Sequence, residues 1–259
     1  MAIRHFFNRN FVLDDGVVAS TDGSSVGTNL PALAIDNDKI TAWEVTSPVT
    51  PNGLKIDLGT AQAIDSVWFY GENVATYRLY YSTDDITYNA AFAAETDEGN
   101  SGFNLKAGFT EQTVRYWRLD ATETTGGNNT KIFEIALMNL QITYDEGEAI
   151  SSVNQLITDR GGGSYTLANG EGASYSGMNN DAKERLEMVF SFLTDAERSA
   201  LFAWWDNATG DARPEVFINP IGDSARAYSA MFENENFEFD YEVDFTGAGW
   251  SGSLVFQQK

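Results

Sequence analysis

Five segments between Leu54 and Ile142 are short runs rich in β-branched and aromatic side chains, the residue types that favour β-strands. In order they read LKIDLG (54–59), SVWFYG (66–71), TYRLYYS (76–82), VRYWRLD (114–120) and IFEIALMNLQI (132–142). Glycines, the Asp84–Asp85 pair and the loop TTGGNNT separate the runs, and no helical period is present there. The pattern predicts a β-sandwich in this half of the chain.

Composition narrows the classes of function. The chain has 259 residues and no cysteine, which rules out disulfides, a thiol nucleophile and a thiolate zinc site. Its net charge of −22 repels nucleic acid and anionic membranes, so ordinary DNA or RNA binding is not expected. The charge suits solubility or salty surroundings, or a surface that must face DNA without adhering to it. The N-terminus has no signal-peptide pattern, and no run approaches the roughly 18 apolar residues of a membrane span.

The composition changes after the predicted sandwich. Residues 144–181 are rich in Gly, Ser and Asn and contain few large apolar residues. We interpret this segment as a domain boundary followed by a loosely structured arm. The chain is therefore predicted to form two domains, residues 1–147 and 148–259.

The second domain reads as strand, helix and further strands. The alternating run RLEMVFSFL precedes TDAERSALFAWWDNATG, in which Thr194 and Glu197 form a capping box. Apolar residues recur at helical spacing on one stripe, and Gly210 is a C-terminal glycine signal. We predict one amphipathic helix over about 194–208 that packs on a sheet formed by the later strands.

One later run, FEFDYEVDF (237–245), alternates strictly between apolar and acidic residues. Its acidic face consists of Glu238, Asp240, Glu242 and Asp244. Same-face residues lie about 7 Å apart along a strand, which is too wide for a single metal site. The face is either solvated or a deliberately anionic lining.

Catalysis is not expected. His5 is the only histidine, which argues against a Ser-His-Asp triad or a multi-histidine metal site. A glycosidase needs only two carboxylates, but no acidic residue here lies in a context that suggests a raised pKa. The sequence therefore predicts that the protein is not an enzyme.

The stretch AIDNDKITAW (34–43) concentrates oxygen donors in a short loop. Asp36 and Asp38 offer carboxylates and Thr41 a hydroxyl or its carbonyl, a set that suits Ca²⁺. A more distant acid would have to connect the loop to the sheet. The alternative is an Asx-turn in a solvated loop, with Trp43 in the core.

The ordered blocks NLPALAIDNDKITAW, LKIDLGTAQAIDSVWFY, YRLYYSTDDITY and VRYWRLDATETTGGNNTKIFEIALM resemble the discoidin, or coagulation-factor type C, domain, over roughly residues 20–142. The resemblance implies a jelly-roll β-sandwich shared with many carbohydrate-binding modules. It also implies a structural Ca²⁺ ion bound by Asp36, Asp38, Thr41 and Glu134. Two residues depart from the family: Asn37 replaces a usual Gly, and Asn tolerates positive φ, while Tyr88 replaces a usual Trp and should still pack.

In that family, ligands bind to variable loops at one end of the sandwich. The corresponding segments here are 46–53, 70–77, the stretch from Phe92 to Phe103, and TTGGNNT. Candidate aromatic platforms for a sugar are Tyr70, Tyr77, Phe92 and Phe103, each of which is also a candidate core residue.

Residues 150–259 are similar to small tail proteins of long-tailed phages, the minor tail protein M and distal tail protein group. The shared plan is a Gly-rich first segment, a strand, a helix, an "F..P" strand, a long hairpin and a last strand ending in "F.q". This resemblance implies a mainly β tail-tube-like domain with one helix that assembles as a homo-oligomeric ring, a hexamer by analogy, around a DNA channel. The acidic run 238–244 would then line the channel.

Together these features predict a virion protein of a phage tail tip or baseplate, assembled in the host cytoplasm beside tube, hub and tape-measure proteins. Its discoidin-like domain would project outward as decoration or to contact a host glycan. The alternative is a stand-alone or cell-surface carbohydrate-binding protein. Neither interpretation involves sequence-specific nucleic acid or a membrane.

Overall fold

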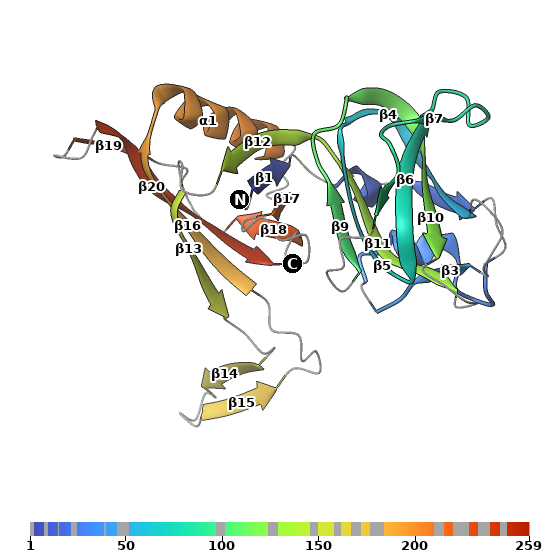
Figure 1. The fold of residues 1–259 in the computed structure, drawn as a ribbon. Helices are drawn as coiled ribbons and strands as arrows, with labels where there is room; N and C mark the ends of the chain where they lie inside the picture. The colour runs from blue at the N-terminus through green and yellow to red at the C-terminus, as the bar shows by residue number, and fades with distance from the viewer. Residues whose placement is uncertain are drawn as a thin grey trace.

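The computed structural model describes residues 3–7, 10–14, 16–21, 25–38, 40–45, 52–96, 102–123, 129–145, 150–157, 162–166, 172–176, 184–209, 215–219, 228–232, 239–243 and 248–258. The fold is mainly β with one α-helix among these residues, as predicted (Figure 1). Within the same ranges, no helix is long and apolar enough to cross a membrane.

The first unit is a sandwich of two antiparallel sheets. One sheet has the order β2-β4-β10-β6-β7, with β8 also paired to β6, and the other has the order β3-β11-β5-β9. Four of the five predicted runs lie wholly in these strands, whereas the fifth, residues 132–142, is divided between β11 and a later strand, β12 (Leu140–Asp145), that belongs to another sheet. The strands are β2 (Val18–Thr21), β3 (Trp43–Val45), β4 (Asn52–Ile64), β5 (Ser66–Glu72), β6 (Val74–Ser82), β7 (Asn89–Ala90), β8 (Glu95–Thr96), β9 (Phe103–Lys106), β10 (Gln112–Glu123) and β11 (Thr130–Met138).

The core of the sandwich lies between these two sheets. Alternate residues of each strand point inward, so the core is built from apolar side chains of both layers. Trp43 and Trp117 are fully buried there. Two 3₁₀ helices, η1 (Phe11–Leu13) and η2 (Pro31–Ala34), pack against β11.

Asn10 attaches η1 to the sheet. Its side-chain oxygen accepts hydrogen bonds from the amides of Val12 (3.1 Å) and Leu137 (3.2 Å). Its amide nitrogen lies 3.5 Å from the carbonyl oxygen of Ile135, to which it donates. Asn10 is 9% exposed, so these bonds are made largely out of contact with water.

The second unit is an eight-stranded antiparallel sheet with the order β12-β1-β17-β18-β20-β16-β13, and β19 also pairs with β20. Its strands are β1 (Ile3–Phe7), β12 (Leu140–Asp145), β13 (Ile150–Ile157), β16 (Glu184–Leu193), β17 (Glu215–Asn219), β18 (Tyr228–Phe232), β19 (Asp240–Val243) and β20 (Ala248–Gln258).

The chain enters and leaves the sandwich through two neighbouring strands of this second sheet. β1 pairs with β12, and Phe7 lies opposite Leu140. Residues 8–139 therefore occupy the position of the turn in a β-hairpin, and the whole sandwich is inserted there. The expected division at residue 147 places β1 and β12 in the first domain, whereas both strands are hydrogen-bonded into the second sheet.

Consecutive phenylalanines of β1 connect the two units. Phe6 is fully buried against the ring of Trp204, edge to face with centroids 5.0 Å apart. Phe7 is fully buried in a separate cluster with Trp68, Ala136 and Met138 on the outer face of the four-stranded sheet. Successive side chains of a strand point to opposite faces, so β1 contributes one aromatic ring to each unit.

Helix α1 (Asp195–Thr209) covers one face of the eight-stranded sheet, as the sequence predicts (Figure 1). The capping box is present: the amide and hydroxyl of Thr194 donate to the carboxylate of Glu197 at 2.7 and 2.8 Å, and the amide of Glu197 donates to the Thr194 hydroxyl at 3.3 Å. Leu201 and Trp204 form the buried stripe. Gly210 lies outside the described residues.

The acidic run is only partly described. β19 contains Asp240, which is exposed, and Glu242, of which only the backbone is described. Glu238 and Asp244 lie outside the described residues. On the other face, Phe239 is 8% exposed, but Tyr241 is 58% exposed. The apolar face that was expected for residues 237–245 is therefore only partly buried where it is described. The exposed ring of Tyr241 lies edge-on against the ring of Trp250.

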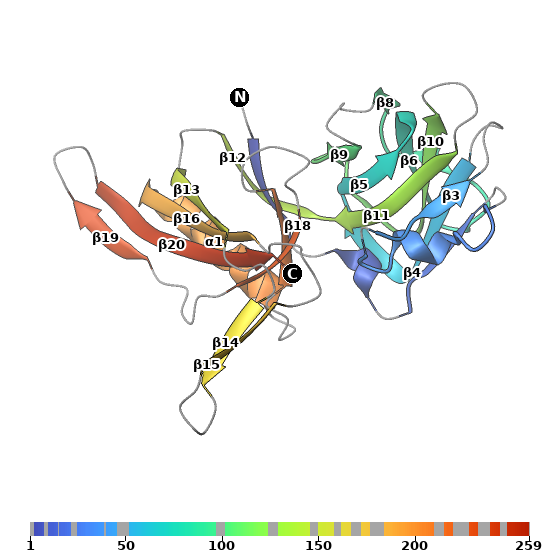
Figure 2. The same ribbon diagram turned by 90° about the horizontal axis from the view of Figure 1, so that it is seen from below.

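A two-stranded hairpin, β14 (Gly162–Thr166) and β15 (Gly172–Ser176), stands apart from both units. It joins β13 to β16 and points away from the eight-stranded sheet in both views (Figures 1 and 2). This hairpin lies in the segment for which the sequence predicts an arm.

Candidate functional site

The oxygen-rich loop at residues 36–41 is held by its own side chains. The Asp36 carboxylate accepts the amide of Asp38 (3.0 Å) and the hydroxyl of Thr41 (2.7 Å). Asp38 accepts the amide of Ile40 at 2.9 Å through its side chain, and its carbonyl lies 3.2 Å from the Thr41 hydroxyl. These bonds form successive Asx-turns, which the sequence offered as the alternative to a Ca²⁺ site. The same turns bring together carboxylate, carbonyl and hydroxyl oxygens, the donors that a cation site needs.

Asn37 adopts φ +59°, so the positive φ expected at this departure from the family is observed. Asn is one of the few residues other than Gly that enter this region readily. The substitution therefore preserves the turn between the two aspartates.

Glu134 lies on the strand beside this loop. It is 4% exposed, and a bulge interrupts the β11–β5 pairing between Ile132 and Glu134. Trp43 pairs with Ile132 in the antiparallel β3–β11 ladder, so Thr41, two residues earlier, is level with Glu134. Among the described residues no three His, Cys, Asp or Glu side chains gather as a metal site. A Ca²⁺ site here fits only if hydroxyl and carbonyl oxygens complete it, as that ion allows.

The described parts of the four predicted ligand loops converge at one end of the sandwich. Val45 pairs with Thr130, and the Gly71 amide donates to the Gly102 carbonyl at 2.9 Å. The Asn73 amide donates to the carbonyl of Asn129 at 3.0 Å. Residues 46–51, 97–101 and 124–128, which complete these loops, lie outside the described residues. We call this region the loop end.

Glu44 joins two of the segments at the loop end. Its carboxylate accepts hydrogen bonds from Asn129 (2.7 Å) and Asn29 (2.6 Å). The bond from Asn129, with help from Asn29 and the charge of Lys131, holds the pKa of Glu44 below its ordinary value. The carboxylate therefore stays ionised and keeps both asparagines oriented.

Two further charged residues follow Glu44 across the four-stranded sheet: Lys131 lies opposite Glu44 in the β3–β11 pairing, and Glu72 lies opposite Lys131 in the β11–β5 pairing. Lys131 forms an ion pair with Glu72, with Nζ 3.5 Å from Oε2, and both side chains are substantially exposed. On the other sheet, the Thr76 and Thr122 hydroxyls lie 2.6 Å apart across β6 and β10. No sequence motif indicated these contacts, although Glu72 and Thr76 lie within the predicted segment 70–77, and Thr122 and Lys131 lie close to the two ends of TTGGNNT.

Two of the predicted aromatic platforms have other roles. Tyr77 is 3% exposed and packs in the sandwich core, which makes it unsuitable as a platform. Phe92 packs against the same core, with its ring 5.3 Å from that of Phe109 and the Lys106 ammonium 5.9 Å from its centroid. Both rings fill space in or against the core, which was the alternative predicted for them from the sequence.

The other two candidates stack on each other. Tyr70 lies face to face with Phe103 (centroids 4.4 Å apart) and with Phe133 (4.6 Å), on the outer face of the four-stranded sheet. The neighbouring rings cover both faces of Tyr70. A sugar that needs a free ring face finds none on Tyr70, so the stack stiffens the sheet beneath the loops.

Tyr88 packs, as expected, and it belongs to a ladder of alternating cations and rings on the outer face of the six-stranded sheet. The Arg118 guanidinium carbon lies 4.7 Å from the ring of Tyr88 and 4.8 Å from that of Tyr80. Lys55 lies 5.3 Å over Tyr88, and Arg78 lies 5.3 Å over Tyr80. Cations cover the ring faces of this ladder, which stabilises the sheet surface.

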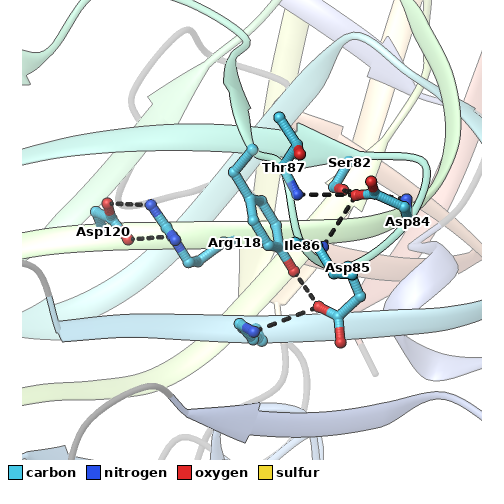
Figure 3. A network of polar contacts seen from close by, with 9 residues as sticks. Ser82, Asp84, Asp85, Ile86, Thr87, Arg118 and Asp120 are labelled. Atoms are coloured by element: carbon cyan, nitrogen blue, oxygen red, sulfur yellow. Dashed lines mark hydrogen bonds and ion pairs between the residues drawn. The ribbon is translucent and has the colours of Figure 1, made fainter.

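Carboxylates balance the charges of this ladder (Figure 3). Arg118 forms a two-point ion pair with Asp120, at 2.8 and 3.0 Å. In the adjoining turn, the amides of Thr87 (2.8 Å) and Ile86 (2.9 Å) donate to the Asp84 carboxylate and lower its pKa. The polar groups drawn in the figure are therefore engaged within the protein and hold the 82–88 turn.

This geometry can now be compared with known proteins. Residues 17–135 match the family model described as the F5/8 type C domain. This segment is an F5/8 type C domain. The domain covers the two-sheet sandwich, the oxygen-rich loop and the loop end, and it stops short of β12. The search of curated proteins gives no match.

Solved carbohydrate-binding modules are similar to the F5/8 type C domain. Chitosan-binding module 1 of a chitosanase/glucanase from Paenibacillus sp. IK-5 shares 22% identity with a TM-score of 0.42, covering 50% of this chain and 98% of the module. The CBM32 of AlyQ, in complex with 4,5-unsaturated mannuronic acid, shares 23% identity with a TM-score of 0.41, covering 48% and 93%. A pectin-binding module shares 22% identity with a TM-score of 0.40, covering 47% and 88%.

Proposed function

We propose that the protein is a glycan-binding protein whose F5/8 type C domain captures a saccharide at the loop end, without catalysis. The observation that carries the proposal is the convergence of the predicted ligand loops on one end of the sandwich, around a polar cluster. Glu44, Glu72 and Lys131 supply charged groups there, and Asn29 and Asn129 supply amides. Sugar hydroxyls both donate and accept hydrogen bonds, so carboxylates, amides and an ammonium suit them.

Removing the Glu72–Lys131 pair tests this location. We expect the double variant Glu72→Ala/Lys131→Ala to weaken glycan binding about tenfold, the loss of roughly one charged hydrogen bond. Its melting temperature should change little, because exposed ion pairs contribute about 0–1 kcal/mol. A glycan array identifies the ligand, with chitosan, pectin and unsaturated uronic-acid oligosaccharides among its probes. Titration calorimetry with the full chain then measures the affinity.

The matched control removes an exposed ion pair that lies outside the four predicted ligand segments. Arg115 contacts Asp57 at 2.5 and 2.8 Å, with side chains 44% and 31% exposed, comparable to the exposures of the Glu72–Lys131 pair. Asp57→Ala/Arg115→Ala should keep wild-type affinity. Equal losses in both double variants would show that the loop end is not the binding site.

We also propose that the loop at residues 36–41 holds a structural Ca²⁺ ion. The donors are the side chains of Asp36, Asp38, Thr41 and Glu134, with the Asp38 carbonyl as a further oxygen. When bound, the ion supplies a positive charge that attracts the loop carboxylates toward β11.

Addition of Ca²⁺ is expected to raise the melting temperature, and Asp36→Ala should abolish the rise. Saturating a site that exists only in the folded state, at about 100 times its Kd, adds about 2.7 kcal/mol of stability. Scanning calorimetry with Ca²⁺ and with chelator measures the effect, and Asp84→Ala, an acid in a different turn, is the control. A wild-type melting curve indifferent to Ca²⁺ would contradict the proposal.

A second candidate is a structural role in a phage tail tip, in which the second unit forms a homo-oligomeric ring. It is favoured by the strand, helix and strand order of β16, α1 and β17 to β20, which follows the plan of the tail proteins named above. Asp240 and the other acids of the run 238–244 would line the ring. Negative-stain imaging of the purified full chain tests this role: closed rings support it, and monomers at all concentrations contradict it.

A further inference from the structure

The second unit presents two features that an isolated chain leaves incomplete. One is the hairpin β14–β15, whose strands pair with each other and with no other described strand. The other is β13, which ends the eight-stranded sheet and has β16 as its one neighbour among the described strands. Among the described strands, the hairpin therefore has no third strand beside it, and the outer side of β13 has no partner strand.

An isolated two-stranded hairpin is at best marginally stable in water, and a third strand stabilises it. The five-residue strands Gly162–Thr166 and Gly172–Ser176 form a short ladder of this kind, in full register. Both views show the hairpin pointing away from the rest of the protein (Figures 1 and 2). A strand supplied from outside would therefore stabilise the hairpin most directly.

The edge strand β13 has few of the usual protections against pairing. Exposed edges are normally protected by charged residues, especially Lys, by Pro, by β-bulges, or by being short. β13 is eight residues long, and its sequence ISSVNQLI contains no charged residue and no proline. Its pairing with β16 is irregular between Ile150 and Ser152 but regular from Ser152 to Ile157. It therefore presents backbone donors and acceptors that another strand can reach.

Charge indicates which partner fits. The chain carries a net charge of −22, so two copies repel each other over most of their surfaces. Residues 160–178, which contain the hairpin, include one Arg and one Glu, and β13 includes no charge. The hairpin and the edge are thus segments through which two copies of this acidic protein can approach without repulsion.

We propose that the hairpin β14–β15 of one copy adds to the β13 edge of a second copy of this chain. The contact is head to tail, because the donor surface differs from the acceptor surface. Each copy keeps a free hairpin or a free edge, so assembly continues until a ring closes or a filament forms. This inference concerns the second unit and does not depend on glycan binding by the first.

The two halves of the contact can be removed separately in the full chain. Replacing residues 160–178 with a short Gly-Ser linker deletes the hairpin. The sheet should tolerate the deletion, because Ile157 and Glu184 are already paired neighbours. To test the edge, Val153→Pro and Asn154→Pro are made as two separate single variants. Successive N–H groups alternate between the two sides of a strand, so one proline faces β16 and the other faces outward.

The proline that faces β16 removes a hydrogen bond within the sheet and should lower the melting temperature. The proline that faces outward should leave the melting curve unchanged, so this variant is the one used to test pairing at the β13 edge. We expect wild type to self-associate in sedimentation velocity across a concentration series. The hairpin deletion and the outward-proline variant should each raise the dissociation constant at least about tenfold. Tyr165→Phe, which preserves the strand, should associate as wild type does, and Tyr165→Pro should not.

Mixing the two defective proteins gives the decisive result. The hairpin-deleted copy retains a good edge, and the outward-proline copy retains a good hairpin, so the mixture should form a one-to-one dimer that stops there. A mixture that stays monomeric overturns the head-to-tail contact. A monomeric wild type up to about 1 mM, the range of the weakest measurable complexes, overturns self-association itself.

Discussion

Replacing Trp204 with alanine is expected to lower the free energy of unfolding by about 3–5 kcal/mol, as for other buried Trp to Ala changes. The side chain is 1% exposed, it packs edge-on against Phe6, and its indole N–H donates to the Phe7 carbonyl at 3.0 Å. The β1–β12 pairing is irregular between Phe6 and Phe7, and the indole binds the backbone at this irregularity. The variant loses the ring contact and leaves the carbonyl without this donor.

Two control variants separate the contributions of Trp204. Trp204→Phe keeps most of the ring packing and loses the hydrogen bond, so a smaller loss of about 1–3 kcal/mol is expected. Trp205→Ala changes the next, partly exposed residue of α1 and should cost less than Trp204→Ala. Urea denaturation followed by circular dichroism measures all three. A Trp204→Ala protein no less stable than Trp205→Ala would refute the anchoring role of Trp204.

The second large effect is expected at Gly102, beside the loop end. Its φ is +87°, and an added Cβ would lie 2.0 Å from the carbonyl oxygen of Gly71. Gly102→Ala should cost about 2–5 kcal/mol, combining roughly 1–2 kcal/mol of left-handed strain with roughly 1–3 kcal/mol for the clash. Since the Gly71–Gly102 hydrogen bond joins two loops, the variant should also bind glycan more weakly.

Gly16 offers a matched control, because its φ is +86° and an added Cβ meets nothing within 4 Å. Gly16→Ala should therefore show the backbone strain alone, about 1–2 kcal/mol. The difference between the two variants in chemical denaturation measures the clash. Equal losses would mean that the backbone of Gly71 moves aside, and the close approach of the two loops would not be required.

The strands of the sandwich and the helix α1 were predictable because local patterns determine them. Each predicted run between Leu54 and Ile142 has its own periodicity and its own turn residues. The capping box of Thr194 and Glu197 fixes the start of α1 in the same local way. The positive φ of Asn37 also followed from one residue and its family position.

The loop end was predictable only as a set of segments. Glu44 contacts asparagines 15 and 85 residues away in the sequence, and no local pattern indicates such pairs. The sequence left the platform and core alternatives open for the aromatic candidates for a related reason. A Tyr in a strand reads the same whether its ring is buried, like Tyr77, or stacked between two neighbours, like Tyr70. Only the three-dimensional register separates a platform from a core residue.

The position of β1 was also hidden from the sequence. Residues 3–7 (IRHFF) are a short run of mixed polarity, and nothing near them in the sequence indicates that their partners are β12 and β17. Strand pairing over such separations depends on the whole fold. The composition change near residue 144 comes after the chain has already entered the second sheet with β12, and it cannot show that the first strand belongs to that sheet as well.

The insertion of the sandwich between β1 and β12 sets an order of events during synthesis. At roughly 5–20 residues per second, β17 is made about 10–40 seconds after β1, so the first strand waits for its second sheet partner. The F5/8 type C domain is complete when β12 appears, and its folding brings the two flanking segments together. A loop of more than a hundred residues is then already closed, which removes much of the entropy cost of pairing Phe7 with Leu140. Folding of the inserted domain thus brings β1 and β12 together before the rest of the eight-stranded sheet has been synthesised.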